Sequence, residues 1–459
     1  MARFRLKNIR ISSVHFIPIS FLIFILLGTG FLMLPISSAS GQYTDFVTAL
    51  FTSTTSVCVT GLVVVDTFAH WSLFGQLVII TLVQIGGLGV VAVGTLILLI
   101  GRKKFSLSER KLIGDSLNVE KNRGLLSFLV RIFKGVFLVE GIGALLYAIS
   151  FVPRFGTWKG IWAAVFQSVS AFCNAGMDVV GPTSMIVFRD SKYLMFVTMT
   201  LIILGGLGFV VWFDVMDGIV AGIKKRFSPI AIFRHLSEHT KLVLIMTFVL
   251  LAVGTAWVFF AEYHNPATMG DMGLGDKLLN SLFQSVTFRT AGFASVPQDG
   301  LTESTCMLGY ILMFIGGSPV GTAGGVKTVT FFFVFMNALS YIRGKKETVI
   351  FNRRVSEEMM RKAAAVVFVS FATVVLMTLL LMSRGGILLT DALYEVVSAL
   401  ATVGLSRGLT PNLDTVGRII IIISMYLGRI GPISMAIFFT KTSGKKNTIT
   451  HSEGTFYVG

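Results

Sequence analysis

The chain has 459 residues, of which 54% are hydrophobic and 14% charged, and its mean hydropathy is +0.80. A soluble domain could not keep that much apolar surface out of water, so the composition excludes an ordinary soluble fold and indicates a chain that is largely surrounded by lipid. The formal net charge of +16 would by itself also fit a protein that binds nucleic acid, and the distribution of this charge decides between the two.

Lys and Arg gather in five stretches, each beside a long apolar segment, and the connections between them contain few basic residues. The stretches are 3–10, 102–123, 224–241, 343–362 and 441–446. This alternation is the positive-inside pattern of polytopic membrane proteins. It predicts that both termini and three basic loops lie in the cytoplasm. Topology and contact with lipid then explain the charge without nucleic acid as a partner.

The first apolar run, 14–34, follows a basic stretch and therefore has to be distinguished from a signal peptide. It is long for such a peptide, and Ser38-Ala39-Ser40 is only a weak cleavage pattern. We therefore expect a helix that is retained in the protein.

Four segments of the chain resemble one another, and each ends with a glycine and one more hydrophobic residue. They are 51–62 (FTSTTSVCVTGL), 166–177 (FQSVSAFCNAGM), 283–293 (FQSVTFRTAGF) and 394–405 (YEVVSALATVGL). Their glycines recur roughly every 115 residues, which indicates four structural repeats across the whole chain.

Each repeat has the same predicted order of elements: a long apolar helix, a helix of roughly a dozen residues that is too short to cross a bilayer, and a second long apolar segment. The long helices are expected at 14–34, 127–151, 241–262 and 362–383, and the second segments at 71–100, 191–222, 304–342 and 415–440. The sequence thus predicts an all-α polytopic membrane protein with eight spanning helices and four re-entrant half-helices, arranged with pseudo-four-fold symmetry around one central pore. The repeats are expected at 1–101, 125–224, 241–343 and 362–441, followed by a cytoplasmic tail at 442–459.

The half-helices indicate which kind of solute passes. Non-helical backbone is tolerated at membrane depth only where it lines water or is buried in protein, so four glycine-bearing re-entrant stretches imply a shared lumen. The C-terminal ends of the half-helices carry partial negative charge and point toward this lumen. The arrangement therefore favours a cation.

We predict that the filter for this cation consists of backbone carbonyl groups, because a dehydrated monovalent cation needs several oxygens to replace its water. Inward-pointing carbonyls require unusual backbone angles, which cost residues other than glycine roughly 1–2 kcal/mol. The alternative, that the glycines only let helices pack closely, is weak when four glycines recur in register. The predicted strands are Val59-Thr60-Gly61, Asn174-Ala175-Gly176, Thr290-Ala291-Gly292 and Thr402-Val403-Gly404.

These single-glycine strands, which read VTGL, NAGM, TAGF and TVGL, resemble the filters of the Trk/Ktr/HKT superfamily of potassium transporters. In that superfamily four helix–pore-helix–helix units in one chain mimic a tetrameric potassium channel. One apolar segment precedes the first strand here, so the chain is similar to KtrB-type bacterial subunits, whereas Trk-type subunits carry an additional N-terminal helix pair. Gly61 follows the potassium-type pattern, whereas one subclass of plant members has serine at this position.

The second segment of each repeat contains a glycine pair, except that in the fourth copy Gly428 is followed by Arg429. A cation in the middle of an apolar helix costs about 2.5–3.5 kcal/mol, so we expect Arg429 to face a cavity or a partner. Facing the pore at about 8 Å from an ion, with an effective dielectric constant near 20, it would oppose a cation by about 2 kcal/mol. A snorkelling or helix-pairing arginine is the alternative interpretation. The resemblance implies that Arg429 is the pore arginine of the family.

The third copy departs in another way, because the segment 316–325 contains five glycines and a proline and cannot form a regular helix. Beside a pore, such a break predicts a mobile loop below the filter, with Lys327 as its anchor. The resemblance implies that this intramembrane loop is the gate. The predicted gate residues are Gly316, Gly317, Ser318, Pro319, Gly321, Thr322, Ala323, Gly324, Gly325, Lys327 and Arg429.

Three other charged residues lie in or beside the apolar segments. We expect Arg289 to brace the third filter strand, and Glu140 and Glu395 to pair with buried polar groups. No nucleophile and base are arranged as an enzyme requires, and the phosphate-loop pattern fails because Val326 separates glycine from Lys327. The sequence predicts a transporter and not an enzyme.

The resemblance implies the pore-forming subunit of a bacterial potassium uptake system in the plasma membrane, with sodium promoting transport. It also implies a homodimer that rests on a cytosolic ring of nucleotide-binding subunits of the KtrA type, and the segment 455–459 resembles a part of KtrB at the dimer interface. A sodium-conducting relative and a non-transport membrane scaffold are the alternatives. A secondary transporter with inverted repeats is disfavoured because all four repeats run in the same direction.

Overall fold

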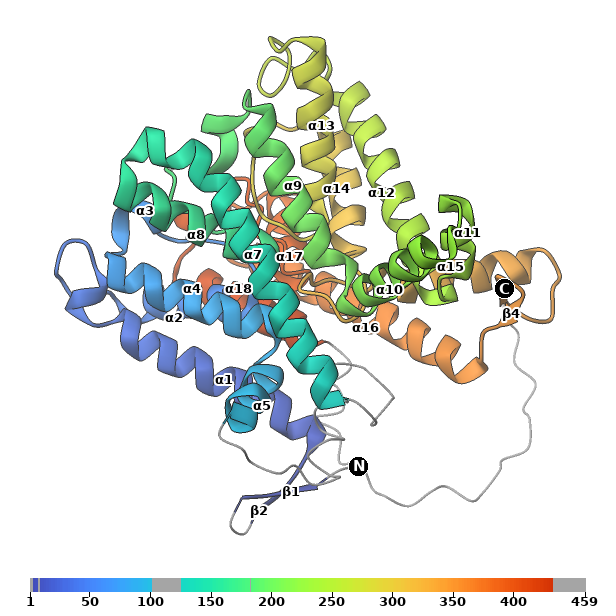
Figure 1. Cartoon of the computed structure of the whole chain (residues 1–459). Helices are drawn as coiled ribbons and strands as arrows, with labels where there is room; N and C mark the ends of the chain where they lie inside the picture. Colours follow the sequence, from blue (N-terminus) through green and yellow to red (C-terminus); the bar gives the residue numbers. More distant parts are fainter. Residues whose placement is uncertain (1–2, 7–8, 101–124, 182, 432–459) are drawn as a thin grey trace.

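The computed structural model is almost entirely helical, and it describes residues 3–6, 9–100, 125–181 and 183–431 (Figure 1). The expected all-α membrane architecture is confirmed. Two short antiparallel hairpins accompany the helices, formed by β1 (Arg3–Leu6) with β2 (Ile9–Ser12) and by β3 (Val349–Ile350) with β4 (Arg353–Arg354). Short connecting helices are α3 (Thr67–His70), α11 (Pro229–His235), η1 (Pro35–Ser37), η2 (Ser184–Phe188) and η3 (Thr410–Asn412). Parts of the sequence predictions lie outside the described residues, namely the basic stretches 102–123 and 441–446, the helix end 432–440 and the tail 442–459 with its segment 455–459.

Each repeat begins with a long apolar helix. These are α1 (Ser13–Leu32), α7 (Leu125–Phe155), α12 (Glu238–Glu262) and α16 (Glu357–Met382). In the first three, a glycine lies so close to the following short helix that an added side chain would strike a serine hydroxyl, in the pairs Gly28 and Ser53, Gly143 and Ser168, and Gly254 and Ser285. The same serines donate hydrogen bonds to the carbonyl oxygens of Ile25 (2.6 Å), Glu140 (2.7 Å) and Leu251 (3.0 Å). Small residues and hydroxyl groups thus join the two helices, as is typical in membranes.

The short helices have 13, 17, 15 and 12 residues and are α2 (Phe46–Cys58), α8 (Thr157–Cys173), α13 (Leu274–Phe288) and α17 (Leu389–Leu400). At 1.5 Å per residue these pore helices are about 18–26 Å long, shorter than the roughly 30 Å hydrocarbon core of a bilayer. Nearly all of their residues toward the C-terminal end are buried. They therefore end inside the protein.

The second apolar segments turn sharply. In repeat 1, α4 (Leu73–Leu88) turns by 97° into α5 (Val90–Ile100), and in repeat 2, α9 (Lys192–Leu207) turns by 101° into α10 (Phe209–Lys225). We expected one continuous helix over each of 71–100 and 191–222, but Gly89 and Gly208 both adopt φ = +90°, which ends the first helix of each pair. In repeat 3 a loop separates α14 (Glu303–Phe314) from α15 (Thr328–Ile342), and in repeat 4 α18 (Thr415–Ile430) leads to the last described residue.

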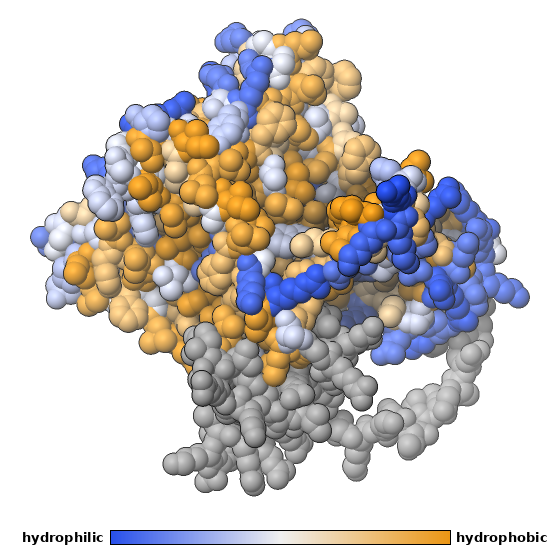
Figure 2. Space-filling view, in the orientation of Figure 1, coloured by the Kyte–Doolittle hydropathy of each residue, from blue (hydrophilic) through white to orange (hydrophobic). Residues whose placement is uncertain are grey.

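The surface of the helices suits a lipid environment. By length and composition, α7, α12 and α16 can each cross a membrane, and among the described residues the number of such spans rises from three to five if each bent pair is one span. Figure 2 shows apolar residues over most of the visible helical body, with hydrophilic residues at its upper edge and near β4. Large side chains such as Phe137, Phe248 and Phe368 are 57%, 73% and 71% exposed, as lipid contact permits.

A buried carboxylate joins the C-terminal end of α12 to the N-terminal end of α14 in repeat 3. Glu262, the last residue of α12, is fully buried. It accepts hydrogen bonds from the backbone N–H and hydroxyl of Thr302 (3.0 and 2.8 Å), from the hydroxyls of Thr305 (2.5 Å) and Thr268 (2.7 Å), and from the amide of Asn265 (2.6 Å). Five donors are needed because a buried charge is costly unless it is fully hydrogen-bonded.

We predict that Glu262→Gln lowers the free energy of unfolding by about 1–3 kcal/mol, because the amide group of glutamine places donors against the existing donors. The purified variant in detergent should unfold at a lower temperature than the wild type. The matched control is Glu238→Gln at the exposed end of the same helix, where the carboxylate lies 3.7 Å from Arg353. Equal unfolding temperatures for the two variants would contradict the stabilising role of the Glu262 cluster.

Candidate functional site

The four predicted filter strands, far apart in the sequence, meet in one ring. An added side chain at Gly61 would lie 3.2 Å from the Cα atoms of both Gly176 and Gly404. One at Gly292 would lie 2.9 Å from the Cα atom of Gly176 and 3.3 Å from that of Gly404. The glycines therefore follow one another around the ring in chain order, as four repeats around a single axis would.

The carbonyl group before each glycine lies against the glycine of a neighbouring strand. An added Cβ would approach the carbonyl oxygen to 2.5–2.8 Å in the first three pairs and more closely in the fourth. The pairs are Ala175 with Gly61, Ala291 with Gly176, Val403 with Gly292, and Thr60 with Gly404. A side chain at any of these glycines therefore has to displace a carbonyl group of the adjacent strand.

The backbone of the strands is unusual at two positions in every repeat. The four glycines have φ values of +101°, +65°, +82° and +96° in chain order. Two residues before each glycine, one or two positions after the pore helix, a residue other than glycine adopts the left-handed conformation. These residues are Val59 (+56°), Asn174 (+59°), Thr290 (+67°) and Thr402 (+51°). β-branched residues rarely adopt this conformation, and three of the four are β-branched. Such strain persists only where the surrounding structure holds the backbone.

Part of this support comes from hydroxyl groups on the pore helices, which the sequence reasoning missed. The hydroxyls of Thr55 and Ser398 accept hydrogen bonds from the N–H groups of Gly61 (2.9 Å) and Gly404 (3.0 Å). The corresponding hydroxyls of repeats 2 and 3 donate to the carbonyl after the filter glycine, in the pairs Ser170 with Met177 and Thr287 with Phe293. A sequence signal existed, because all four repeats have Ser or Thr five or six positions before the glycine.

Several polar atoms at the filter have no hydrogen-bond partner among the described residues. They are the hydroxyls of Thr60 and Thr402 and both amide atoms of Asn174. All three residues belong to the predicted strands and are buried. Polar groups of this kind are available to water or to a cation that moves along the axis.

The glycine pairs of the second segments let these helices touch the ends of the pore helices. A side chain at the first glycine would strike a pore-helix carbonyl, in the pairs Gly86 with Val57, Gly205 with Phe172, and Gly428 with Leu400. Three residues after this glycine the chain turns at Gly89, Gly208 and Gly431, with φ between +90° and +92°. In repeat 3 the equivalent residue is Pro319, and a loop replaces the turn.

This loop, residues 315–327, is closed on itself and is held by repeat 2. A parallel bridge joins Ile315 to Val326, and the N–H of Gly317 donates to the carbonyl of Gly324 (3.1 Å). Backbone hydrogen bonds to repeat 2 join Ser318 to Gly206, Thr322 to Gly205 and Phe209 to Val320. In this structure the two ends of the loop are thus joined to each other, and its middle is joined to repeat 2.

The same loop touches the base of the filter. The N–H of Gly324 donates to the hydroxyl of Thr290 in the third strand (3.2 Å), and the hydroxyl of Thr322 donates to the carbonyl of Phe172, just before the second strand (3.1 Å). A side chain at Gly324 would also strike Thr402 of the fourth strand. The loop therefore lies directly against three of the four repeats at the end of their pore helices.

Three basic side chains donate to carbonyl groups of this loop. Arg429 binds the carbonyl of Thr322 (2.8 Å) and, with its other terminal nitrogen, those of Gly86 (2.5 Å) and Gly87 (3.4 Å) in repeat 1. Lys327 donates to Ala323 (2.6 Å), which is a contact within the loop region, and Arg289 donates to Gly316 (3.3 Å). Arg289 was expected to brace the third filter strand, but its hydrogen bond is to the loop.

The two acidic residues expected to pair with buried polar groups do so behind the filter. Glu140 accepts from the amide of Gln84 (3.1 Å), and Glu395 accepts from the hydroxyl of Ser406 (3.0 Å). Among the described residues, no group of three His, Cys, Asp or Glu side chains could hold a metal ion.

Comparisons with known proteins identify a family of cation transport proteins that resemble this chain. A family model described as TrkH, cation transport protein, matches residues 9–449. The chain is 38% identical over 454 residues to Ktr system potassium uptake protein B of Bacillus subtilis (strain 168), which covers 99% of this chain and 98% of that protein. It is 37% identical over 426 residues to potassium/sodium uptake protein NtpJ of Enterococcus hirae, with 92% and 91% covered. The crystal structure of the potassium transporter TrkH from Vibrio parahaemolyticus has a TM-score of 0.72 over 96% of this chain and 87% of that chain, and the 16% identity makes this a likeness of fold.

We predict that Thr55→Val loosens the first filter strand, because the N–H of Gly61 loses its acceptor in a buried place, at a cost of about 1–2 kcal/mol. Amide hydrogen exchange in the peptide that covers Gly61 should become about tenfold faster. Thr54→Val is the matched control, because the Thr54 hydroxyl bonds only to the Leu50 carbonyl of its own helix (2.7 Å). Exchange that is equally slow in both variants would contradict a role of the Thr55 hydroxyl in holding the strand.

Proposed function

Because this chain belongs to the TrkH family of cation transport proteins, we propose that it is the pore-forming subunit of a bacterial potassium uptake system. Potassium passes through a filter of backbone carbonyls formed by the strands that end at Gly61, Gly176, Gly292 and Gly404. The observation that carries the proposal is the ring of these four glycines, in which each glycine lies against a carbonyl group of a neighbouring strand. The ring provides several oxygens around one axis, as a dehydrated monovalent cation requires.

The relatives support potassium as the ion. Two of the names given above are potassium uptake protein and potassium/sodium uptake protein, at 38% and 37% identity over nearly the full chain. The glycine at position 61 is the potassium-type residue of the first strand. A filter without acidic side chains selects by the cost of replacing water around the ion, which is lower for potassium than for the smaller sodium ion.

The loop at 315–327 is the gate in this proposal. It lies against the base of the filter through Thr290 and Thr322, and Arg429 holds it to repeats 1 and 4. The positive charges of Arg429, Lys327 and Arg289 raise the energy of a cation below the filter. Conduction then requires that the loop moves away and that the hydrogen bonds of Arg429 to Thr322 break.

The remaining parts of the proposal concern assembly and topology. The protein lies in the plasma membrane as four repeats, at 1–101, 125–224, 241–343 and 362–441, with both termini in the cytoplasm, and the positive-inside pattern supports this orientation. It forms a homodimer on a cytosolic ring of KtrA-type nucleotide-binding subunits. The words "Ktr system" in the name of the relative support a system of more than one component. Sodium promotes the transport of potassium.

A sodium-conducting pore is the second candidate, because one relative is named for both ions. Competition between the two ions separates the candidates. Uptake of rubidium, a tracer for potassium, resists excess sodium in a potassium-selective pore and is suppressed by it in a pore that conducts sodium.

We predict that Gly61→Ser weakens discrimination against sodium. A serine Cβ at φ = +101° would lie 2.5 Å from the carbonyl oxygen of Ala175, so this oxygen has to move away from its place in the ring. In proteoliposomes, sodium should then inhibit rubidium uptake at a concentration about tenfold lower than in the wild type, equivalent to a shift of about 1.4 kcal/mol.

The control for this experiment is Gly41→Ser, because Gly41 also has a positive φ (+69°) but no atom lies within 4 Å of an added Cβ. Unchanged competition in folded Gly61→Ser protein would remove Gly61 from the filter.

We predict that Arg429→Ala increases the flux of rubidium, because the substitution removes both the link between Thr322 and Gly86 and a positive charge below the filter. The measurement is the initial rate of uptake per folded protein in proteoliposomes without a regulatory subunit. Arg418→Ala on the same helix is the matched control, since its guanidinium binds only the nearby carbonyls of Leu413 and Pro411. A lower rate in well-folded Arg429→Ala protein would count against the gate.

A further inference from the structure

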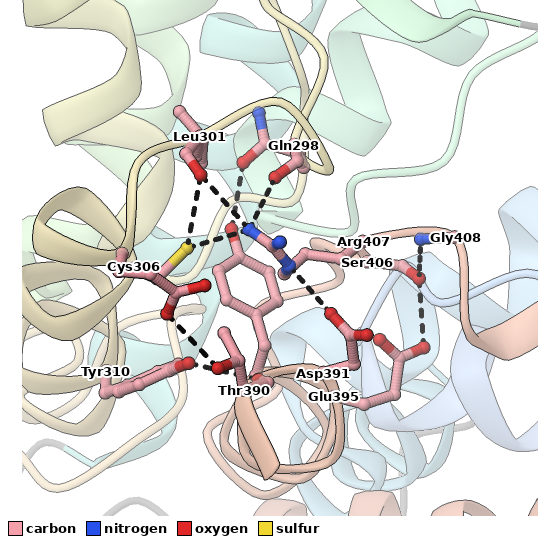
Figure 3. A network of polar contacts seen from close by, with 12 residues as sticks. Gln298, Leu301, Cys306, Tyr310, Thr390, Asp391, Glu395, Ser406, Arg407 and Gly408 are labelled. Atoms are coloured by element: carbon pink, nitrogen blue, oxygen red, sulfur yellow. Dashed lines mark hydrogen bonds and ion pairs between the residues drawn. The ribbon is translucent and has the colours of Figure 1, made fainter. Parts of the chain in front are cut away.

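The end of the fourth filter strand that faces away from the gate loop is fixed to its own pore helix at two neighbouring positions (Figure 3). Asp391 and Glu395 lie one turn apart on α17. The hydroxyl of Ser406 donates to Glu395 (3.0 Å), and the guanidinium Nε of Arg407 donates to Asp391 (2.9 Å). Ser406 and Arg407 are the second and third residues after Gly404, so these contacts hold the chain directly where it leaves the filter.

Arg407 also reaches into repeat 3. Its Nη1 atom donates to the carbonyl oxygens of Gln298 (3.3 Å) and Leu301 (3.4 Å) and lies 2.9 Å from the sulfur of Cys306 (Figure 3). Only 12% of the Arg407 side chain is exposed. The hydroxyl of Tyr394 on α17 adds a second link between the repeats, because it donates to the side-chain oxygen of Gln298 (2.9 Å).

No equivalent of this arrangement exists in the other repeats. Arg407 lies three positions after its filter glycine, and the residues at this position in the other repeats are Val64, Val179 and Ser295. Asp391 lies three positions before the aromatic residue that begins its repeat segment. The residues at that position in the other repeats are Thr48, Ala163 and Asn280. None of these six residues can form an ion pair. The contacts of Arg407 are therefore a feature of the junction between repeats 3 and 4 alone.

The gate loop touches the same junction between repeats 3 and 4, at the opposite end of the filter strands. Gly324 of the loop donates to Thr290 of the third strand and leaves no room for a side chain beside Thr402 of the fourth. Between these two levels, the carbonyl of Val403 lies against Gly292. Movement of the loop therefore changes the contacts of strands 3 and 4 at their base. At the other end, Arg407 holds the chain that leaves strand 4 to the segment of repeat 3 that follows strand 3.

We propose that Arg407 is a positioning residue that fixes the chain leaving the fourth filter strand to its own pore helix and to repeat 3, and so sets the discrimination between potassium and sodium. The proposal rests on the filter assigned under the proposed function. A planar guanidinium is suited to this role because it can donate in several directions at once, to Asp391 and to the carbonyl groups of repeat 3. A lysine ammonium can replace the charge but cannot reach all of these acceptors in one position.

The test uses full-length protein in proteoliposomes and measures rubidium uptake at increasing sodium concentrations. Arg407→Gln and Asp391→Asn should each lower the sodium concentration needed for half inhibition by about two- to tenfold, which corresponds to the loss of an ordinary hydrogen bond. Arg407→Lys should restore part of the difference. The double variant Arg407→Gln with Asp391→Asn should show a total loss smaller than the two single losses combined, because both changes remove one shared interaction. The maximal rate per folded protein should change much less than the competition.

Glu303→Gln is the matched control. Its carboxylate lies in the same region and accepts from the hydroxyl of Thr390 (3.1 Å), but it does not bind Arg407. If Glu303→Gln lowers the half-inhibiting concentration as much as Asp391→Asn does, the general negative charge of this region is responsible and the proposal is wrong.

Folding of the variants is checked by size-exclusion chromatography and unfolding temperature. If Arg407→Gln does not fold, Asp391→Asn decides the question, because it leaves the hydrogen bonds of Arg407 to repeat 3 in place. Unchanged competition in the folded variants overturns the role of Arg407 when Gly61→Ser alters competition in the same assay. If Gly61→Ser is also without effect, the failure lies in the proposed filter itself.

Discussion

The structure depends on the contact between four glycines and four carbonyl groups at its centre. Each of Gly61, Gly176, Gly292 and Gly404 lies so close to a carbonyl oxygen of the neighbouring strand that no Cβ atom fits between them. A ring of this kind exists only if all four strands reach the same level with the same backbone conformation. Three features serve this condition: the left-handed residues that follow the pore helices, the hydroxyl groups of those helices, and the glycine contacts of the long helices. The repeat in the sequence is thus explained by a shared geometric demand.

Deviations from four-fold symmetry are concentrated on repeats 3 and 4. The helix of repeat 3 is interrupted by the loop at 315–327, and Arg429 of repeat 4 connects this loop to Gly86 in the last turn of α4. Arg407 joins the same two repeats at the other end of the filter. The loop touches the strands directly, so the proposed gate and the proposed filter are in contact. In our proposal, Arg407 holds the chain on the far side of the filter.

Much of the architecture could be predicted from the sequence, because its signals are local and repeated. The length of the apolar runs predicted the long helices, and the recurring glycine segments indicated where the chain enters the protein interior. Five glycines and a proline predicted the interruption at 316–325. The sharp turns at Gly89 and Gly208 were not foreseen, since a single glycine in an apolar run is also compatible with a straight helix. Contacts between repeats were not predictable either. The partners of Arg429 in repeats 1 and 3 and those of Arg407 in repeat 3 lie 101 to 343 positions away in the chain, and no periodic pattern identifies them.

The most direct test of the central claim is to locate the ion. The structure should be determined from protein prepared in a rubidium or thallium salt, whose anomalous scattering marks the bound cation, and again in sodium. We predict an anomalous peak on the axis of the ring, among the carbonyl groups of the strands that end at Gly61, Gly176, Gly292 and Gly404, and the loss of this density in sodium. A cation bound elsewhere, on side chains away from the four strands, together with an empty ring, would contradict the account.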